Sequence, residues 1–459
     1  MPMKIIATII VILFMLAPAS ALAQAKSIKR LTIPTKSRLC PKDTHRGDRE
    51  FKGHGPDVTA TARLRIDART RVTLFLTLHA IETRKDWTEA RGDWTYQIYK
   101  APIGFKVNRI LSDAVSEAKY RDTNHKLDVP KVTKGNLVRR FEINGDTSGN
   151  DIGNCTTGDV YMNVRFNPVR IEIQELEKII TRFTNRSDYP RQSVNKLSQN
   201  IRAIASNGAH WYFTQSGSLW KIPVSFDLNS LGLLLPASAK AIDIPPFLER
   251  KGYRRFGDLD YYRGYIFAAL EGDGRVKDRP LVAVFRATDL ALEKTISMGR
   301  WLKSIGWIAI NPVTGNLYTS QAALTPVAKR FKVKIAPEDV TLAPASNYAL
   351  HQRNGGGLSL QNPQSGTFSA DGRYLFVVDR QGPTSRLMSF NRRTGREMVS
   401  SLFISKGTGL MAVSYVNTGT KAPGVRGVLH VVMRQPDPQA RHAFSLKHYS
   451  VVEGFDWNN

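Results

Sequence analysis

The stretch GDLDYYRGYIFAALEG, residues 257–272, decides the fold because its pattern recurs along the second half of the chain. A turn residue precedes a short strand, a glycine turn follows, and an aromatic and β-branched strand then ends in a polar loop. Aligned on this second strand, the recurring units read HWYFTQSG from His210, YIFAALEG from Tyr265, NLYTSQAA from Asn316, YLFVVDRQ from Tyr374 and VLHVVMRQ from Val428.

The spacing of these units is nearly constant. The gaps between the marker residues are 54, 52, 57 and 54 positions, for Trp211, Tyr265, Leu317, Tyr374 and Val428. A period of this length, with strand patterns and almost no helical periodicity, is typical of a radial β repeat. We therefore expect residues 199–459 to form a five-bladed β-propeller of four-stranded blades, with six blades as the alternative.

The last repeat unit ends without a fourth strand, because only VEGFDWNN follows the third strand. A ring left open would expose unpaired backbone groups along one strand edge. Residues 193–199 stand directly before the first unit and alternate apolar and polar side chains. We expect them to pair with residues 443–451 and close the ring.

The first half of the chain also favours an all-β structure. Strand-like runs between about residues 57 and 173 alternate apolar and polar residues, as in Val58, Ala60, Ala62, Leu64 and Ile66. Such alternation is typical of strands with one buried face. The pattern predicts a β-sandwich over residues 40–175.

The segments around these two domains have different compositions. Residues 1–23 combine Lys4, an apolar run and the small-residue site Ala21–Ala23, which predicts a signal peptide cut after Ala23, with an uncleaved anchor as the alternative. Residues 24–39 read as a basic linker. Within the connector 176–198, apolar residues at helical spacing predict a short amphipathic helix. The mature protein is expected to be secreted or periplasmic.

The chain is strongly basic, with 66 Lys and Arg against 39 Asp and Glu and a formal net charge of +27. An evenly basic surface favours anionic partners such as polysaccharide, envelope components or nucleic acid, although a generally basic proteome would produce the same balance. Clusters between strands are the candidate binding residues: Arg254, Arg255, Lys329, Arg330, Arg392 and Arg393.

Acidic residues supply a different candidate site. Asp258 and Asp260 lie two residues apart on a predicted innermost strand, so both side chains face one side of the sheet. Beside a channel they could bind a metal or act as an acid–base pair, with Glu271 at the rim. The alternative is structural: Asp258 caps a turn and Asp260 pairs with an arginine.

The loop 144–159 could hold a divalent cation. It carries Asp146, Asp151 and Asp159 among glycines, and oxygen ligands suit calcium, although Asp and Gly are also common turn residues. The two cysteines, Cys40 and Cys155, are expected to form a disulfide in an exported protein; two buried thiols are the alternative.

The units FSADGRYLFVVDR and AINPVTGNLYTS resemble the repeats of secreted propellers, including the NHL-repeat and gluconolactonase-like families. The resemblance covers about residues 199–459. It implies a propeller fold, and in gluconolactonase-like enzymes a divalent metal is held in the central channel by acidic and Asn ligands. That ligand set has no residue-by-residue match in this sequence, so the resemblance does not carry the activity over.

Two functions follow from these patterns. The first is an exported binding protein whose propeller and basic surface hold an anionic polymer or a protein partner. The second is a metal-assisted hydrolase or lyase that uses Asp258 and Asp260 in the propeller channel.

Overall fold

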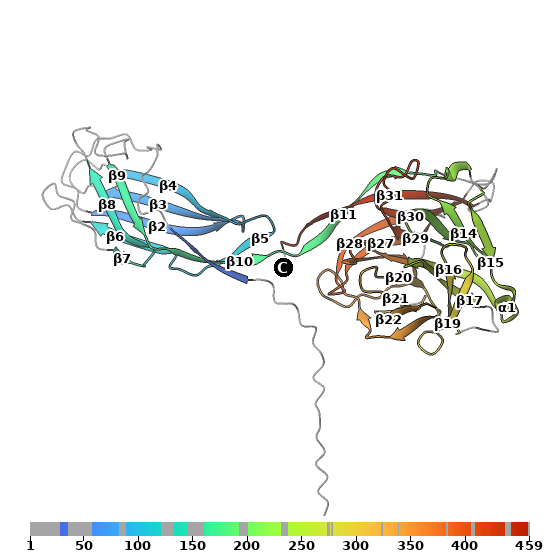
Figure 1. Ribbon diagram of the computed structural model, residues 1–459. Helices are drawn as coiled ribbons and strands as arrows, with labels where there is room; N and C mark the ends of the chain where they lie inside the picture. Colours follow the sequence, from blue (N-terminus) through green and yellow to red (C-terminus); the bar gives the residue numbers. More distant parts are fainter. Residues whose placement is uncertain are drawn as a thin grey trace, which may run out of the picture. The chain divides into compact units, whose positions relative to one another are not determined.

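The computed structural model divides the chain into two compact units, Met1–Lys178 with Phe455–Asn459 and Ile179–Gly454 (Figure 1). It describes residues 28–34, 57–81, 89–120, 132–145, 160–191, 201–230, 237–272, 276, 279–322, 325–337, 339–381, 384–404, 409–436 and 442–457. Met1–Lys178 with Phe455–Asn459 is unit 1, and Ile179–Gly454 is unit 2.

The described strands of unit 1 form antiparallel sheets around one core. The largest sheet has the order β4 (Glu89–Lys100), β3 (Arg71–Ile81), β2 (Asp57–Asp67), β6 (Val115–Tyr120) and β7 (Val132–Lys134). The second has the order β1 (Ile28–Ile33), β10 (Val169–Glu175) and β5 (Phe105–Ile110), and β8 (Val138–Gly145) pairs with β9 (Val160–Phe166). Side chains from all of these sheets meet in a single hydrophobic cluster.

The alternating apolar residues of β2 and β3 in unit 1 are buried, as predicted. Ala60, Ala62 and Leu64 on β2 are buried, and so are Val72 and Leu74 on β3. These strands pair directly, with Leu64 opposite Leu74. The apolar face of the predicted alternation is therefore the core face.

The C-terminal residues belong to unit 1. Asp456 donates its backbone N–H to the Glu177 carbonyl at 2.9 Å, and Arg69 Nη1 donates to the Trp457 carbonyl at 2.6 Å. Gly104, whose φ is +85°, lies against the Phe455 ring, where an added Cβ would be 3.1 Å from the ring. The chain therefore enters unit 2 and returns to unit 1 at its end.

The described strands of unit 2 form five antiparallel sheets, drawn from green to red in Figure 1. Four of them are built from consecutive strands. The first contains β12 (Ala203–Ser206), β13 (His210–Thr214), β14 (Ser218–Pro223) and β15 (Lys240–Asp243). The second contains β16 (Tyr253–Tyr262), β17 (Tyr265–Gly272), β18 (Leu281–Arg286) and β19 (Leu292–Ser297).

The next two sheets repeat this order. One contains β20 (Trp307–Ile310), β21 (Asn316–Ser320), β22 (Val327–Ala336) and β23 (Asp339–Pro344), with β24 (Tyr348–Ala349) on β22. The other contains β25 (Pro363–Phe368), β26 (Tyr374–Gln381), β27 (Thr384–Asn391) and β28 (Glu397–Ile404). The short helix η1 (Leu228–Ser230) lies between β14 and β15 of the first sheet, and α1 (Pro246–Arg250) connects the first sheet to the second.

The last sheet of unit 2 combines distant segments. Its order is β11 (Lys178–Asp188), β31 (His442–Phe455), β30 (Leu429–Pro436) and β29 (Gly409–Tyr415). A strand from the N-terminal side therefore completes the last sheet, and it is β11, which occupies the edge of β31 opposite β30. Residues 193–199, which were predicted to pair with residues 443–451, lie outside the described residues.

The same strand corrects the predicted helix in the connector 176–198. Ile179, Ile180 and Phe183 fit a helical stripe, yet Lys178–Asp188 is extended. Ile179 and Ile180 are buried in a cluster with residues of the last two sheets. Pairing with β31 satisfies the backbone of β11, and this tertiary contact outweighs the local helical pattern.

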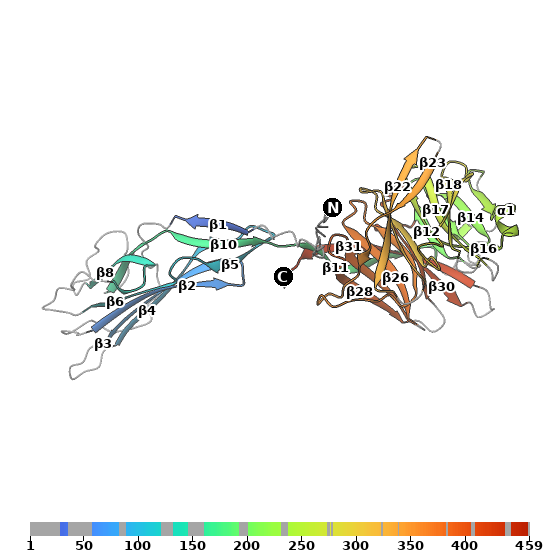
Figure 2. The same ribbon diagram turned by 90° about the horizontal axis from the view of Figure 1, so that it is seen from below.

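The sheets of unit 2 follow one another in a cycle. The first strands contact each other in the order β12, β16, β20, β25, β29 and back to β12. Hydrophobic clusters fill the spaces between successive sheets, and one of them joins the last sheet to the first two. Figure 2 shows the same sheets turned by 90°. This arrangement is propeller-like.

Candidate arginine site

Four arginines gather at the end of the cycle where the first strands begin. Arg202 directly precedes β12, and Arg255 lies near the start of β16. Arg380 and Arg434 lie near the ends of β26 and β30, which run back toward the same end as second strands of antiparallel pairs. We call these residues, with Glu271 and Ser216, the arginine cluster.

Most of the cluster occupies one position of the sequence repeat. The seventh residues of the aligned units are Ser216, Glu271, Ala322, Arg380 and Arg434. Equivalent positions of a cyclic repeat lie at the same end of the ring, and the cycle of first strands brings these sheets around one centre. The repeat therefore places polar side chains of different sheets near one another.

Direct contacts tie part of the cluster together. Arg202 Nε donates to Ser216 Oγ at 3.4 Å. Arg255 and Glu271 are paired across β16 and β17, and Arg255 Nε lies 3.7 Å from Glu271 Oε2. The Phe256 N–H donates to the Ser216 carbonyl at 2.8 Å, which joins the first two sheets beside the cluster.

The charges in the cluster act on each other. Burial lowers the pKa of Arg202, and Arg255 and Arg434 lower it further, while Glu271 opposes them. The pKa of Arg434 is also lowered, by burial and then by Arg380. Guanidinium groups stay charged at neutral pH, so this end of the cycle concentrates positive charge from several sheets.

Asp258 and Asp260 have a different environment from the predicted one. Asp258 Oδ2 accepts the Ile308 N–H at 2.8 Å and the Gly366 N–H at 3.1 Å. Asp260 Oδ2 accepts the Ile310 N–H at 2.6 Å, and its Oδ1 accepts the Tyr261 N–H at 2.8 Å. Each acid thus bonds to backbone N–H groups, whereas the structural alternative had Asp258 capping a turn and Asp260 pairing with an arginine.

Burial changes the ionisation of both acids. It raises the pKa of Asp258 well above its usual range, and Asp260 adds to this shift. Burial also raises the pKa of Asp260 to about 7. Asp258 is only 2% exposed, and its Oδ1 has no hydrogen-bond partner among the described residues. Within those residues there is no group of three or more His, Cys, Asp or Glu side chains that could hold a metal ion.

Glu271 belongs to the arginine cluster and pairs with Arg255. It lies beside Gly257, where an added Cβ would be 3.7 Å from Glu271 Oε1. Asp258 is the next residue, but its carboxylate bonds to β20 and β25. The catalytic role of these acids stays a prediction.

The other predicted basic residues lie apart from the cluster. Lys329 Nζ donates to Asn347 Oδ1 at 3.2 Å, and Arg330 bonds to Ser346. Arg330 and Arg392 both act on the buried Tyr348, whose hydroxyl donates to the Asn391 carbonyl at 2.8 Å. Of the six predicted basic residues, Arg255 joins the arginine cluster; Arg254 and Arg393 are exposed.

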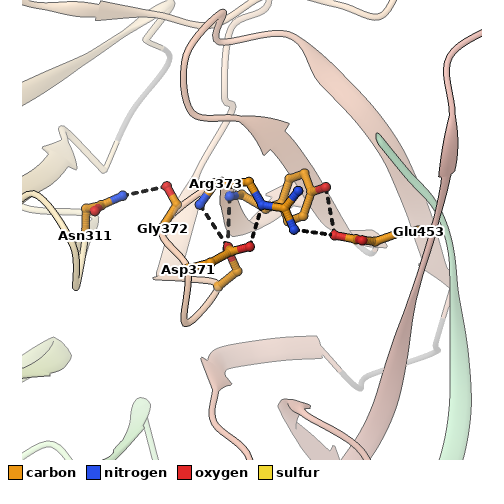
Figure 3. Close-up of polar contacts among 7 residues, drawn as sticks. Asn311, Asp371, Gly372, Arg373 and Glu453 are labelled. Carbon is orange, nitrogen blue, oxygen red and sulfur yellow. Dashed lines mark hydrogen bonds and ion pairs between the residues drawn. The ribbon is translucent and has the colours of Figure 1, made fainter. Parts of the chain in front are cut away.

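At the opposite end of the cycle, Arg373 is paired with two acids (Figure 3). Arg373 forms ion pairs with both Asp371 and Glu453, and the Tyr374 hydroxyl donates to Glu453 Oε1 at 2.9 Å. Asn311 Nδ2 donates to the Gly372 carbonyl at 2.7 Å. These contacts connect the β25–β26 turn to β31 and to the turn after β20.

Several predicted features lie outside the described residues. They are the signal peptide, residues 24–27 and 35–39 of the predicted linker, the calcium ligands Asp146, Asp151 and Asp159, and the disulfide of Cys40 and Cys155. Residues 28–33 of that predicted linker form β1 and pair with β10, so the prediction of a linker is wrong there. No described helix is long and apolar enough to cross a membrane.

Sequence reasoning missed Arg202, Arg380 and Arg434. They are single arginines spread over more than 200 positions, so no local cluster marks them. The available signal was their place in the repeat, because Arg380 and Arg434 share the seventh position with Glu271 and Ser216.

Comparison with known proteins identifies a domain but no function. Residues 36–171 match a family model described as a domain of unknown function (DUF8251). No curated protein matches the chain.

Solved structures similar to the chain include propeller proteins at low identity. A luciferin-regenerating enzyme is 10% identical, with 89% of this chain and 95% of that chain covered and a TM-score of 0.33. The Dos1 propeller is 10% identical, over 55% of this chain and 68% of that chain, with a TM-score of 0.27. An endo-arabinanase from Bacillus licheniformis is 14% identical, over 60% and 98%, with a TM-score of 0.33.

Proposed function

We propose that unit 2 is a five-bladed β-propeller whose arginine cluster binds an anionic polymer, and that unit 1 is a β-sandwich. The observation that carries the proposal is the convergence of Arg202, Arg255, Arg380 and Arg434 from four different sheets at one end of the cycle. The signal-like residues 1–23 support an exported protein, and polysaccharide or an envelope component is then the expected polymer.

The chemistry of the cluster favours carboxylate or phosphate groups. Guanidinium presents several N–H donors in a plane and matches these anions in a two-pronged geometry. Half-buried Arg202 has given up part of its hydration, and Arg255 and Arg434 act on its charge. An anion bound here would relieve the repulsion between these cations. At the opposite end, Arg373 already has two carboxylate partners.

The test compares two doubly substituted proteins with the same net charge. Arg255→Gln with Arg380→Gln removes two exposed cations of the cluster, whereas Lys334→Gln with Arg353→Gln removes two exposed cations elsewhere. Binding to polygalacturonate and to single-stranded DNA is measured at 50 and 200 mM salt, conditions that bracket physiological screening. We expect the cluster variant to bind about tenfold more weakly and with a shallower salt dependence.

The control variant should bind like the unsubstituted protein. Equal loss in both variants would mean that overall charge, and not the cluster, attracts the polymer. Absence of binding to both polymers at 50 mM salt would contradict the proposal. Preference for polygalacturonate over DNA would identify carboxylate polysaccharide as the ligand class.

A further inference from the structure

Two histidines are buried side by side in the sheet that completes unit 2. His430 on β30 lies opposite His448 on β31, and both are 0% exposed. Their Nδ1 atoms are 2.6 Å apart, and their ring centroids are separated by 4.9 Å. We call these two residues the histidine pair.

The outer nitrogen of each ring faces a backbone carbonyl. His430 Nε2 lies 2.9 Å from the Val416 oxygen, and His448 Nε2 lies 2.8 Å from the Tyr189 oxygen. Tyr189 directly follows β11, and Val416 directly follows β29. The contacts therefore form one continuous series across the sheet, from Val416 at the end of β29 to Tyr189 at the end of β11.

The three contacts of the histidine pair need more hydrogens than two neutral rings supply. Each contact needs one hydrogen, but two neutral imidazoles carry only two N–H groups. In the neutral pair one of the three contacts therefore lacks a hydrogen: either an Nε2 lone pair faces a carbonyl oxygen, or the two Nδ1 lone pairs face each other. One extra proton fills all three contacts. A second extra proton would force two N–H groups against each other at 2.6 Å and bring two positive charges together.

The surroundings do little to support such charges. Among the described residues, the charged group that acts on His448 is Asp188, whose carboxylate already pairs with Lys447 at 2.8 Å. Trp211 on β13 meets His430 edge to face, with ring centroids 5.1 Å apart, and brings no charge. Burial lowers the pKa of His430 to about 3 and that of His448 to about 4.

We propose that the histidine pair makes the sheet β11–β31–β30–β29 sensitive to acid. The pair stabilises the contact between β11 and β31 at neutral pH, and this contact weakens when both rings bind protons. The geometry carries this proposal because the native contacts hold at most three protons, whereas two free imidazolium ions carry four. Acidification therefore favours any state in which the rings separate. The first backbone to be released is Tyr189, whose carbonyl oxygen contacts His448 Nε2.

The sign of the effect follows from linkage. Because the folded pair holds fewer protons than the unfolded rings, its stabilisation is complete above the unfolded pKa of about 6.5 and is lost as pH falls toward about 4. One proton difference changes the unfolding equilibrium constant about tenfold per pH unit, and two change it about a hundredfold.

The first experiment measures chemical denaturation between pH 6 and pH 5. The double variant His430→Gln with His448→Gln keeps polar side chains but cannot titrate, and His351→Gln is the control because His351 lies outside the closing sheet. We expect the unfolding equilibrium constant of the unsubstituted protein to rise about ten- to a hundredfold more than that of the double variant. His351→Gln should follow the unsubstituted protein.

A second experiment needs no variant and stays decisive if the double variant fails to fold. Hydrogen exchange of backbone amides in the full chain is followed by mass spectrometry at pH 7.5 and pH 5, as protection factors. Segments around residues 178–191 and 409–416 should lose about tenfold or more protection relative to β16–β19. Uniform loss, unchanged protection, or equal pH slopes for the unsubstituted protein and the double variant would overturn the proposal.

Discussion

Two connections between sheets of unit 2 use the same geometry with different chemistry. Asp258 and Asp260 on β16 accept the N–H groups of Ile308 and Ile310 on β20 at 2.8 and 2.6 Å. On the other side of the cycle, Ser365 Oγ and Thr367 Oγ1 on β25 accept the N–H groups of Val413 and Tyr415 on β29 at 3.1 and 3.3 Å. In both cases side chains two residues apart bond to N–H groups two residues apart.

The two-residue spacing of Asp258 and Asp260 is therefore explained by the hydrogen bonds that connect one sheet to the next. Serine and threonine perform the same task at the second connection, so the task needs an acceptor oxygen and no ionisable group. The first strand of a sheet leaves backbone N–H groups on its free edge, and buried N–H groups require partners. Asp258 also accepts the Gly366 N–H, and it therefore joins three sheets.

The largest expected effect is that of Asp258→Ala. Removing this carboxylate leaves the N–H groups of Ile308 and Gly366 without their acceptor in a buried region. We expect a loss of about 2–5 kcal/mol in the free energy of unfolding, measured by chemical denaturation. A loss below that of Ser365→Ala would break the comparison, because the acid would then contribute less than the hydroxyl.

Ser365→Ala should cost less. It leaves the Val413 N–H without its 3.1 Å acceptor and removes the side-chain hydrogen bond between Ser365 and Asp258, and Ser365 is fully buried. The expected loss is about 1–2 kcal/mol in the same denaturation experiment. If Ser365→Ala is neutral while Asp258→Ala is severe, the two connections are not equivalent.

The smallest expected effect is that of Asp258→Asn at neutral pH. Its amide oxygen can replace Oδ2, and its NH₂ group takes the place of Oδ1, which has no partner among the described residues. We expect a change within about 1 kcal/mol. Loss of several kcal/mol would show that a full carboxylate is required at this position.

The same variant has an expected signature in pH. Because burial raises the folded pKa of Asp258 well above its usual range, the folded state keeps a proton that the unfolded state releases above about pH 4. The contribution of Asp258 is therefore greatest at low pH and declines as pH rises. Asp258→Asn should remove this decline between pH 5 and pH 7, opposite in sign to the histidine pair.

The sequence was sufficient for the repeat and for the faces of its strands. Trp211, Tyr265, Leu317 and Tyr374 lie in the predicted second strands, and Val428 directly precedes the fifth. Turn residues and apolar–polar alternation are local signals, so they can be recognised without knowledge of the tertiary structure. Residues of the first predicted strands, such as Leu259 and Ile308, are buried as expected for strands inside the cycle.

The closing strand and the arginine cluster needed tertiary information. The side chains of Ile179, Ile180 and Phe183 fit a helix by spacing, and only the free edge of β31 selects a strand for them. Likewise, Arg202 and Arg434 become neighbours because the last sheet contacts the first, which no local pattern encodes. The hydrogen-bond partners of Asp258 and Asp260 needed tertiary information as well, because these partners are backbone groups of other sheets.

The return of the chain to its starting unit has a consequence for synthesis. The strand β11 emerges from the ribosome before the four consecutive sheets, but its partner β31 ends at Phe455, so more than 250 residues must follow before the pair can form. At roughly 5–20 residues per second, the edge of β11 waits on the order of tens of seconds. Unit 1 waits as long for Phe455–Trp457, and a nascent chain interrupted before residue 442 leaves both units unfinished.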